Sequence, residues 1–317
     1  MDAAPPTSEA VAGDGLQVVE LSGAIRLGVD RQGDGACAAG DEFDILITTA
    51  PEAPRPWVSV APAELDGLMA ELAAAAARTP VAAAVMAQVL RLGAHLPFDE
   101  ALILESLAYS MLLAGAEFRA WRAATPVRTR PPSEGPRVRL AREEGVLVVA
   151  FARSEARNAV DAAMRDDLVE ALSFAAVDPE QTPVLLTGDG PSFSAGGDLD
   201  EFGKATDPAA AHAIRVAQSP ARLLRGLGVR GGARVHGACI GAGIEIPAAA
   251  ARVTASPDAW FRLPEVAMGL IPGAGGTASI PRRIGRERTC FMALSGRAIE
   301  VPTALAWGLV DAVEDAS

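Results

Sequence analysis

The sequence predicts an α/β fold built from repeated strand–helix–strand units, with an additional helical region on the N-terminal side. After residue 136, apolar segments of strand length alternate with helical segments, an order typical of parallel strand pairing. Residues 61–124 instead carry apolar residues at helical spacing throughout. Between the two regions, residues 125–136 (TPVRTRPPSEGP) combine proline, glycine and charge without apolar periodicity, which predicts a linker.

The composition excludes several classes of function. The chain has 317 residues, 50% of them hydrophobic, which is enough for a large core. Its net charge of -12 disfavours nucleic acids and anionic membranes as partners. Three cysteines without paired spacing fit a reducing compartment, and three scattered histidines give no zinc pattern. The N-terminus lacks a signal-peptide pattern, and no apolar run reaches the roughly 20 residues of a membrane helix, so we expect a cytoplasmic protein.

Each segment has its own expected structure. Residues 1–15 predict a disordered tail, and residues 16–60 predict a small unit of β-like stretches. Prolines and glycines interrupt the helical pattern of 61–124, which predicts two or three long helices. Residues 137–317 form the last unit. Its expected elements are the strand VLVVAFA, the helix AVDAAMRDDLVEALSFAA, the strand TPVLLTG, one helix near 207–225, and the segments GGARVHGACI and IEIPAAAARV.

Two glycine-rich turns follow strands in this last unit. In VLLTGDGPSFSAGGDLDEF (184–202), Gly196 and Gly197 allow backbone conformations that a side chain forbids. ACIGAGIEIP (238–247) ends a strand and opens a helix, whose first NH groups lack partners and attract negative charge. Either turn alone is compatible with a simple tight turn, and neither matches a phosphate-binding fingerprint. Together they could hold one oxygen between two NH groups, which is an oxyanion hole.

GACIGAGIEIP (237–247) is apolar or glycine throughout except for Glu245. A lone carboxylate in apolar surroundings costs several kcal/mol, roughly, unless it is paired or neutralised. We therefore expect Glu245 to have a structural or a chemical reason to be there.

Five motifs in this order resemble the crotonase, or enoyl-CoA hydratase/isomerase, superfamily over about residues 138–315. The motifs are RSEARNAV (153–160), FSAGGDLDEF (193–202), HGACIGAGIEIP (236–247), FRLPEVAMGLIPGAGGTASIPRRIG (261–285) and ALAWGLVDAV (304–313). The resemblance implies crotonase-like repeated βαβ units and stabilisation of an acyl-CoA enolate by two backbone NH groups. It places those donors at Gly197 and Ala242.

The resemblance also implies roles for two acids. Glu245 would orient and deprotonate water for attack at the β-carbon, and Glu265 would exchange the proton at the α-carbon, with no metal and no cofactor beyond the coenzyme A of the substrate. The structural alternative is that Glu245 only caps its helix and that Glu265 forms an ion pair with Arg262 or Arg282.

The family binds coenzyme A largely through backbone, and the matching motifs imply a set of contacts on two segments. These residues are Ala156, Arg157, Ala195, Asp198 and Leu199. Arginines that follow the glycine-rich segment could add phosphate contacts or form a solvated face. These are Arg282, Arg283, Arg286 and Arg288. For His236 and Cys239 we expect buried packing.

Residues 71–124 resemble the helices that relatives carry after the WGLVD motif. This implies a circular permutation with residues 125–136 as the joint, against the alternative of an unrelated helical domain. If the helices dock in that way, Phe118, Trp121 and Arg122 would approach the CoA adenine. The resemblance further implies a homotrimer or a dimer of trimers.

The two acids favour hydration of a 2-enoyl-CoA, or its reverse, as the activity. Two alternatives lie within the family: double-bond isomerisation, which can run on one glutamate, and a cofactor-free dioxygenase, which does not use this pair. A third alternative is a non-catalytic assembly subunit that keeps the fold without the chemistry.

Overall fold

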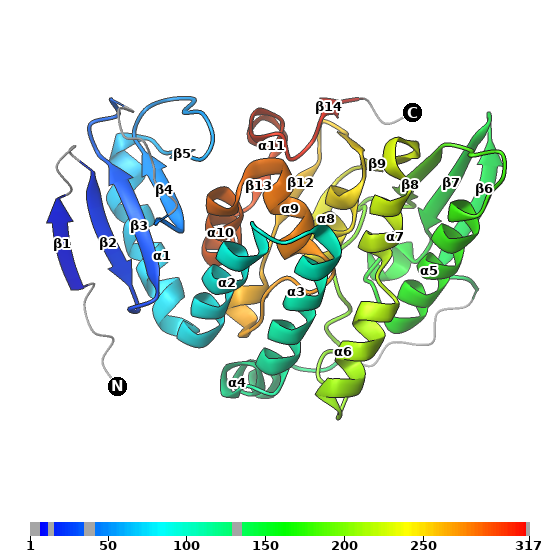
Figure 1. Cartoon of the computed structure of the whole chain (residues 1–317), viewed down its shortest axis with the longest axis horizontal. Helices are drawn as coiled ribbons and strands as arrows, with labels where there is room; N and C mark the ends of the chain where they lie inside the picture. The colour runs from blue at the N-terminus through cyan, green and yellow to red at the C-terminus, as the bar shows by residue number, and fades with distance from the viewer. Residues whose placement is uncertain (1–6, 12–15, 35–41, 129–134, 315–317) are drawn as a thin grey trace.

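The computed structural model describes residues 7–11, 16–34, 42–128 and 135–314. An N-terminal β-sheet, a group of helices and a larger α/β unit lie side by side in that order (Figure 1). The larger unit contains the six-stranded sheet β14-β11-β9-β8-β7-β6. Its strands are β6 (Val138–Glu143), β7 (Val146–Phe151), β8 (Val184–Gly188), β9 (Gly231–Val235), β11 (Arg252–Ala255) and β14 (Ala312–Val313).

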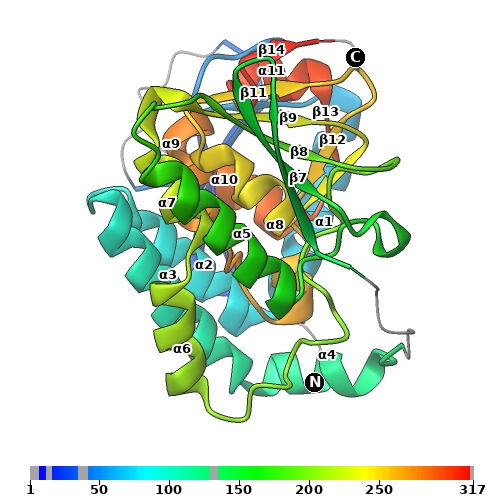
Figure 2. The same ribbon diagram turned by 90° about the vertical axis from the view of Figure 1, so that its right-hand side faces the viewer.

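Five of these strands pair in parallel, from β7 through β8, β9 and β11 to β14, and β6 pairs with β7 antiparallel. The parallel pairing confirms the predicted α/β class of repeated βαβ units. A second, three-stranded sheet contains β10 (Ala238–Ile240), β12 (Trp260–Arg262) and β13 (Ile299–Glu300). The helices of this unit are α5 (Ala162–Ala176), α6 (Pro208–Ala217), α7 (Pro220–Gly226), α8 (Ala242–Glu245), α9 (Gly276–Ile284), α10 (Arg286–Ser295) and α11 (Val301–Trp307). Figure 2 shows α5 and α7 beside the large sheet.

The single helix expected near 207–225 is in fact two, α6 and α7. The break falls at Gln218 and Ser219 because the Ser219 hydroxyl accepts a hydrogen bond from Arg222 N and caps a new helix. Pro220 then occupies the first position of α7, where its missing NH costs nothing.

The helical region forms α1 (Leu65–Arg78), α2 (Pro80–Gly93), α3 (Phe98–Leu113) and α4 (Ala116–Ala124). This is one helix more than the largest number expected, because Gly115 separates α3 from α4. A side chain at Gly115 would lie 2.8 Å from the carbonyl oxygen of Leu112. Among the described residues no single helix is long and apolar enough to cross a membrane. Two helix pairs pass that test together, with bends of 104° and 63° at their junctions.

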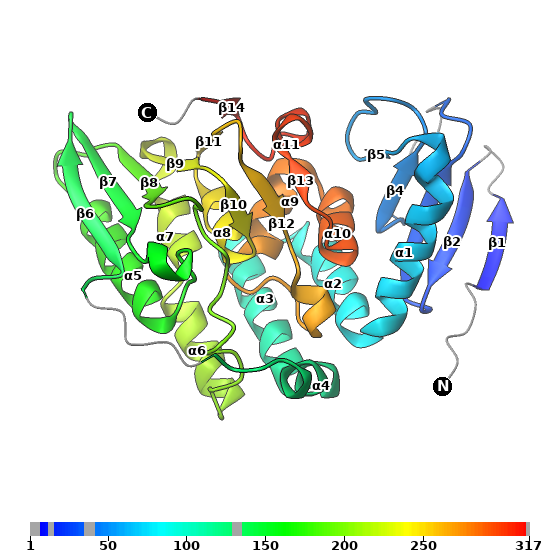
Figure 3. The ribbon, with the colours of Figure 1, turned by 180° about the vertical axis from the view of Figure 1, so that it is seen from behind.

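The four helices pack directly on the α/β unit. α2 lies against α9 and α10, and α3 lies against α9 and α6 (Figures 1 and 3). One continuous apolar core contains Leu72 and Met86 from these helices together with Met292 from α10. At the closest approach, a methyl group on Gly273 would lie 2.4 Å from the Tyr109 ring of α3. The helical region is therefore part of the same folded body as the α/β unit.

The N-terminal sheet has the strand order β1-β2-β3-β4-β5. Its strands are β1 (Thr7–Val11), β2 (Gln17–Leu21), β3 (Ile25–Asp30), β4 (Ile45–Thr48) and β5 (Val58–Ser59). Strand β1 lies within the predicted tail 1–15, where pairing with β2 satisfies its backbone groups. The other residues of that tail lie outside the described part, as do residues 129–134 of the predicted linker 125–136.

Arginines of α10 hold the N-terminal sheet against the α/β unit. Arg288 is buried and donates to the carbonyl oxygens of Trp57 at 2.9 Å and Ala53 at 3.0 Å. Arg286 donates to the Phe43 carbonyl at 2.8 Å. These two candidates for phosphate contacts are thus structural, and neither forms a solvated face.

Candidate active site

A cavity of about 330 Å³ opens between α3, α6 and the glycine-rich turns of the α/β unit. Gly197, Ala242, Glu245 and Glu265 all line it. The remaining wall is largely apolar and includes Leu102, Leu113, Phe202, Ile214 and Ile246. The four residues expected to carry chemistry therefore share one cavity, although they come from three separate motifs.

The two predicted amide donors are free of protein partners. Neither Gly197 N nor Ala242 N hydrogen-bonds to another residue in the described part of the chain. The two turns touch, since a side chain on Gly196 (φ +88°) would lie 2.7 Å from the carbonyl oxygen of Ile240. Only glycine combines that φ with that close approach. Two NH groups from adjacent turns thus lie at the same cavity wall.

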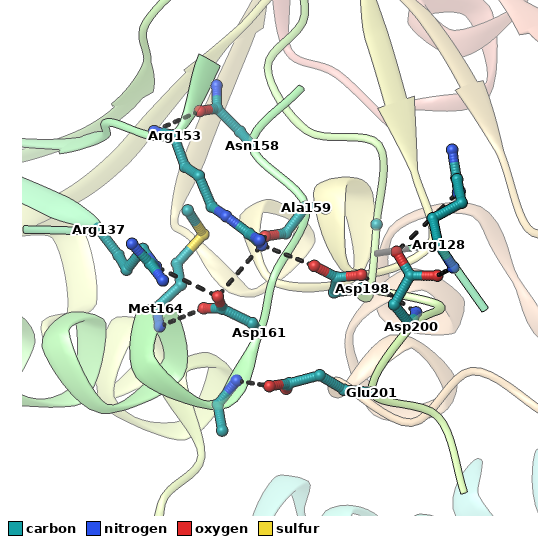
Figure 4. A network of polar contacts seen from close by, with 12 residues as sticks. Arg128, Arg137, Arg153, Asn158, Ala159, Asp161, Met164, Asp198, Asp200 and Glu201 are labelled. Atoms are coloured by element: carbon teal, nitrogen blue, oxygen red, sulfur yellow. Dashed lines mark hydrogen bonds and ion pairs between the residues drawn. The ribbon is translucent and has the colours of Figure 1, made fainter. Parts of the chain in front are cut away.

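An ion-pair network beneath the first turn fixes its position (Figure 4). The buried Arg153 guanidinium contacts Asp198 at 2.7 Å and Asp161 at 3.2 Å. Arg137 contacts the same Asp161 oxygen at 3.1 Å. Asp198 directly follows Gly197, so this network holds the Gly197 amide in place.

Glu245 is oriented by the loop that enters α9. Its Oε2 accepts hydrogen bonds from Ala274 N at 2.7 Å and Gly276 N at 3.0 Å. These donors belong to the start of α9, where free NH groups favour a negative charge. The position of Glu245 follows from α8, which opens at Gly241 with φ +50°.

Glu265 lies beside Glu245 across the Gly241 backbone. A methyl group on Gly241 would lie 2.3 Å from Glu265 Oε1 and 3.7 Å from Glu245 Oε1. Because both distances start from the same point, the two carboxyl groups are neighbours. Glu265 Oε2 is buried without a hydrogen-bond partner among the described residues, and no ion pair joins Glu265 to Arg262 or Arg282 there. The ion-pair alternative for Glu265 is therefore wrong.

Sequence reasoning missed a third acid, Glu105 of α3. It accepts hydrogen bonds from Gly275 N at 2.7 Å, Thr277 N at 2.8 Å and the Thr277 hydroxyl at 2.7 Å. The four successive amides of residues 274–277 thus alternate between Glu245 and Glu105. Glu105 stands alone in the apolar stretch ALILESLAY, so the argument that singled out Glu245 applied to it equally.

Burial raises the pKa of all three acids. The apolar surroundings raise the pKa of Glu265 to about 8 and that of Glu105 to about 7, and the amide and hydroxyl donors oppose the shift at Glu105. The pKa of Glu245 is raised well above its usual value, first by burial and then by the nearby charges of Glu265 and Glu105. A cluster of this kind retains protons at neutral pH.

Of the five predicted coenzyme A contacts, only Asp198 lines the cavity. Its carboxylate is engaged by Arg153. Ala195 N donates to the Arg157 carbonyl at 2.9 Å, which ties the two segments together. The other two residues of the set are Ala156, which is buried, and Leu199. Coenzyme A binding at these positions stays a prediction.

The remaining candidates lie away from the cavity. Arg283 contacts Asp311 at 3.2 Å, and Arg282 donates to the Leu96 carbonyl at 2.7 Å. Cys239 is buried, as expected, whereas His236 is only partly buried and hydrogen-bonds to the Gly190 carbonyl at 2.8 Å.

A second cavity of about 420 Å³ adjoins the first. Phe118, Arg119 and Arg122 of α4 line it, and the two cavities share wall residues on α3 and around α6. Arg122 donates to the Leu199 carbonyl at 2.5 Å, and Trp121 stacks on Phe118 with ring centroids 5.7 Å apart. The expected approach of these residues to the CoA adenine stays a prediction.

The family described as enoyl-CoA hydratase/isomerase matches residues 141–316. The chain belongs to this family. The match makes it an enzyme of the crotonase superfamily with hydratase-like relatives, as the five motifs predicted.

Individual family members cover the same part. The chain is 36% identical to the 2,3-dehydroadipyl-CoA hydratase of Escherichia coli (strain K12), over 55% of its own length and 68% of that protein. It is 34% identical to the mevalonyl-coenzyme A hydratase SIDH of Beauveria bassiana, over 52% of its own length and 62% of that protein. The chain thus spans about two thirds of these relatives. Among solved structures, the enoyl-CoA hydratase of Thermoplasma volcanium aligns with a TM-score of 0.51 and 28% identity, over 58% of this chain and 73% of that one.

Proposed function

We propose that the protein adds water across the double bond of a 2-enoyl-CoA thioester, or catalyses the reverse elimination. The observation that carries the proposal is the sharing of one cavity by two unpartnered amides, at Gly197 and Ala242, and two neighbouring acids, Glu245 and Glu265. The first pair suits an oxygen that becomes negative, and the second pair suits a proton exchange.

In the proposed reaction the thioester oxygen lies between the two amides. Glu245 takes a proton from water, the water oxygen bonds to the β-carbon, and the electrons of the double bond move onto the thioester oxygen. Glu265 then delivers a proton to the α-carbon as the enolate collapses. The two amides on Glu245 favour its ionised form, so we assign it the base and Glu265 the acid.

Electrostatics support a proton shared between the two acids. Glu245 and Glu265 both lie beside Gly241, and they cannot both ionise without mutual repulsion. The pair therefore retains one proton at neutral pH. Glu265, which lacks a donor for Oε2, suits the protonated role.

Isomerisation remains the second candidate because it needs one acid only. In a hydratase Glu245 deprotonates the attacking water. An isomerase with a single acid adds no water and needs no such base. The neighbouring carboxyls favour hydration.

The test uses absorbance of the enoyl-thioester band with crotonyl-CoA and longer 2-enoyl-CoA substrates. We expect hydration by the unmodified chain, and a fall in kcat of roughly 100-fold or more in Glu245→Gln and in Glu265→Gln. Glu170→Gln, on the exposed face of α5 and outside the cavity lining, is the matched control and keeps full activity. Unchanged absorbance across all chain lengths would favour a non-catalytic assembly subunit. A 3-enoyl-CoA converted to its 2-enoyl isomer without hydration would favour the isomerase.

We also propose that α1–α4 correspond to the helices that relatives carry after the WGLVD motif. The close docking of α3 and α4 onto the cavity supports it. A chain in which residues 61–124 follow residue 314 tests the proposal, with retained folding and activity as the expected result. Loss of folding would favour an unrelated helical domain.

A further inference from the structure

Polar groups gather on one part of the cavity wall, where α3 faces α6. Arg215 and Gln218 reach it from α6 and the residues that follow it, and Tyr109 reaches it from α3. None of the three has a part in the proposed hydration. They add polar groups to a wall that is largely apolar and that also holds the acids of the site and Arg165.

Arg215 carries a largely buried positive charge without an anionic partner. Its Nη1 donates to the hydroxyls of Ser106 at 2.9 Å and Ser110 at 3.0 Å, and its guanidinium stacks on the Tyr109 ring at 4.5 Å. Its Nε and Nη2 have no hydrogen-bond partner, and no carboxylate pairs with it, within the described residues. Burial lowers the pKa of Arg215, which is the cost of holding a cation in this wall.

Gln218 adds an unsatisfied group to the same wall. Its Oε1 is buried and has no partner among the described residues. The two ends of an amide exchange by rotation, so the side chain can present either an acceptor or an NH₂ donor to the cavity. The Tyr109 hydroxyl likewise has no hydrogen-bond partner in the described part of the chain. These groups leave hydrogen-bonding capacity that a ligand can use.

The nearby charges do not satisfy Arg215. Glu105 attracts it at a distance, but both Glu105 oxygens are occupied by Gly275 and Thr277. The cavity's other arginine, Arg165, is already paired with Asp166 at 2.7 Å.

We propose that Arg215, with Gln218 and Tyr109, binds a carboxylate at the far end of the acyl group, so that the preferred substrates are ω-carboxy-2-enoyl-CoA thioesters. An incoming carboxylate supplies the anion that Arg215 lacks and pairs with its two free nitrogens in a fork geometry. A methyl-terminated acyl group leaves the buried guanidinium unpaired, which disfavours its binding. This inference rests on the proposed function for its reaction and on Arg215 for its specificity.

The experiment compares two acyl groups that differ only at their end. Hex-2-enoyl-CoA and hex-2-enedioyl-CoA have six carbons each and end in methyl and carboxylate. The saturated pair, hexanoyl-CoA and adipyl-CoA, reports binding by calorimetry independently of the reaction. In the unmodified enzyme we expect kcat/KM and affinity to favour the carboxylate roughly tenfold or more.

Arg215→Met should lower the carboxylate-to-methyl ratio by roughly ten- to hundredfold in both measurements. Arg215→Lys keeps the positive charge but cannot form two parallel hydrogen bonds to a carboxylate. Its carboxylate-to-methyl ratio should therefore lie between those of Arg215→Met and the unmodified enzyme. Arg222→Met, whose guanidinium donates to the Ala217 carbonyl and does not line the cavity, is the matched control and should leave the ratio unchanged.

The outcomes separate the two proposals. A preference of the unmodified enzyme for the methyl end overturns the carboxylate site, and so does an equal loss for both ligands in Arg215→Met, which would mean a structural or phosphate-binding role. Absence of hydration with tighter binding of adipyl-CoA would overturn the reaction and retain the site.

Discussion

Glu265 is a buried acid whose protonation couples the site to the stability of the fold. Its pKa is 4.5 in the unfolded chain and about 8 in the folded one, mainly because of burial. The folded protein therefore keeps a proton that the unfolded chain loses, and stability falls as the pH rises from about 4.5 through about 8. Glu265→Gln removes this dependence.

We expect the melting temperature of Glu265→Gln to exceed that of the unmodified protein by an amount that grows from pH 5 to pH 9, to the order of a few degrees. Thermal unfolding at a series of pH values measures the difference. A constant difference across this range would show that the carboxyl group is not held protonated.

Glu105 shows at the same scale where sequence reasoning stops. The spacing of family motifs places Gly197, Ala242, Glu245 and Glu265 in one site, and they do share a cavity. No motif of the core includes Glu105, because it comes from a helix far away in the sequence. Its partners become visible only when α3 is docked on residues 274–277.

At the scale of elements, the contact between α3 and the loop before α9 depends on Gly273. A methyl group there would lie 2.4 Å from the half-buried Tyr109 ring, so the ring or the backbone would have to shift. We expect Gly273→Ala to destabilise the protein by about 1–3 kcal/mol in denaturant unfolding. Tyr109→Leu should recover part of this loss in the double variant.

Gly67→Ala is the control for that experiment. Gly67 lies inside α1 with open space around its α-carbon, so the added methyl should stabilise the protein by up to about 1 kcal/mol. Equal effects at the two positions would contradict the tight contact at Gly273.

The elements differ in how far the sequence predicts them. The apolar runs that become β7 and β8 and the helical spacing of α1–α3 are local patterns, and they predict the type of element correctly. The split of 207–225 into α6 and α7 depends on the Ser219 cap and on Pro220. A serine followed by a proline does not by itself predict the start of a new helix. The roles of Arg286 and Arg288 depend on carbonyl groups more than 200 residues away, which no local pattern reveals.

For the whole molecule, Arg288 is a buried polar link between the N-terminal sheet and the α/β unit. Its burial lowers its pKa to about 10, and charged hydrogen bonds of this kind are each worth about 1.5–3 kcal/mol. We expect Arg288→Met to loosen the N-terminal sheet, so that limited proteolysis cleaves within 16–60 several-fold faster.

Arg252→Met provides the comparison, because Arg252 forms an exposed pair with Glu314 and should leave the cleavage rate unchanged. Equal rates for Arg288→Met and the unmodified protein would show that apolar packing alone holds the sheet.

The alternation of amides 274–277 between Glu245 and Glu105 makes α3 part of the candidate active site. Each carboxylate accepts hydrogen bonds from every second amide of residues 274–277. A rotation of one carboxylate would therefore shift the backbone that orients the other. A tilt of α3, whether from a bound thioester or from a neighbouring subunit, would therefore re-aim Glu245. In the proposed reaction, the segment with the family motifs provides the acid and the base, and α3 sets the direction in which Glu245 points.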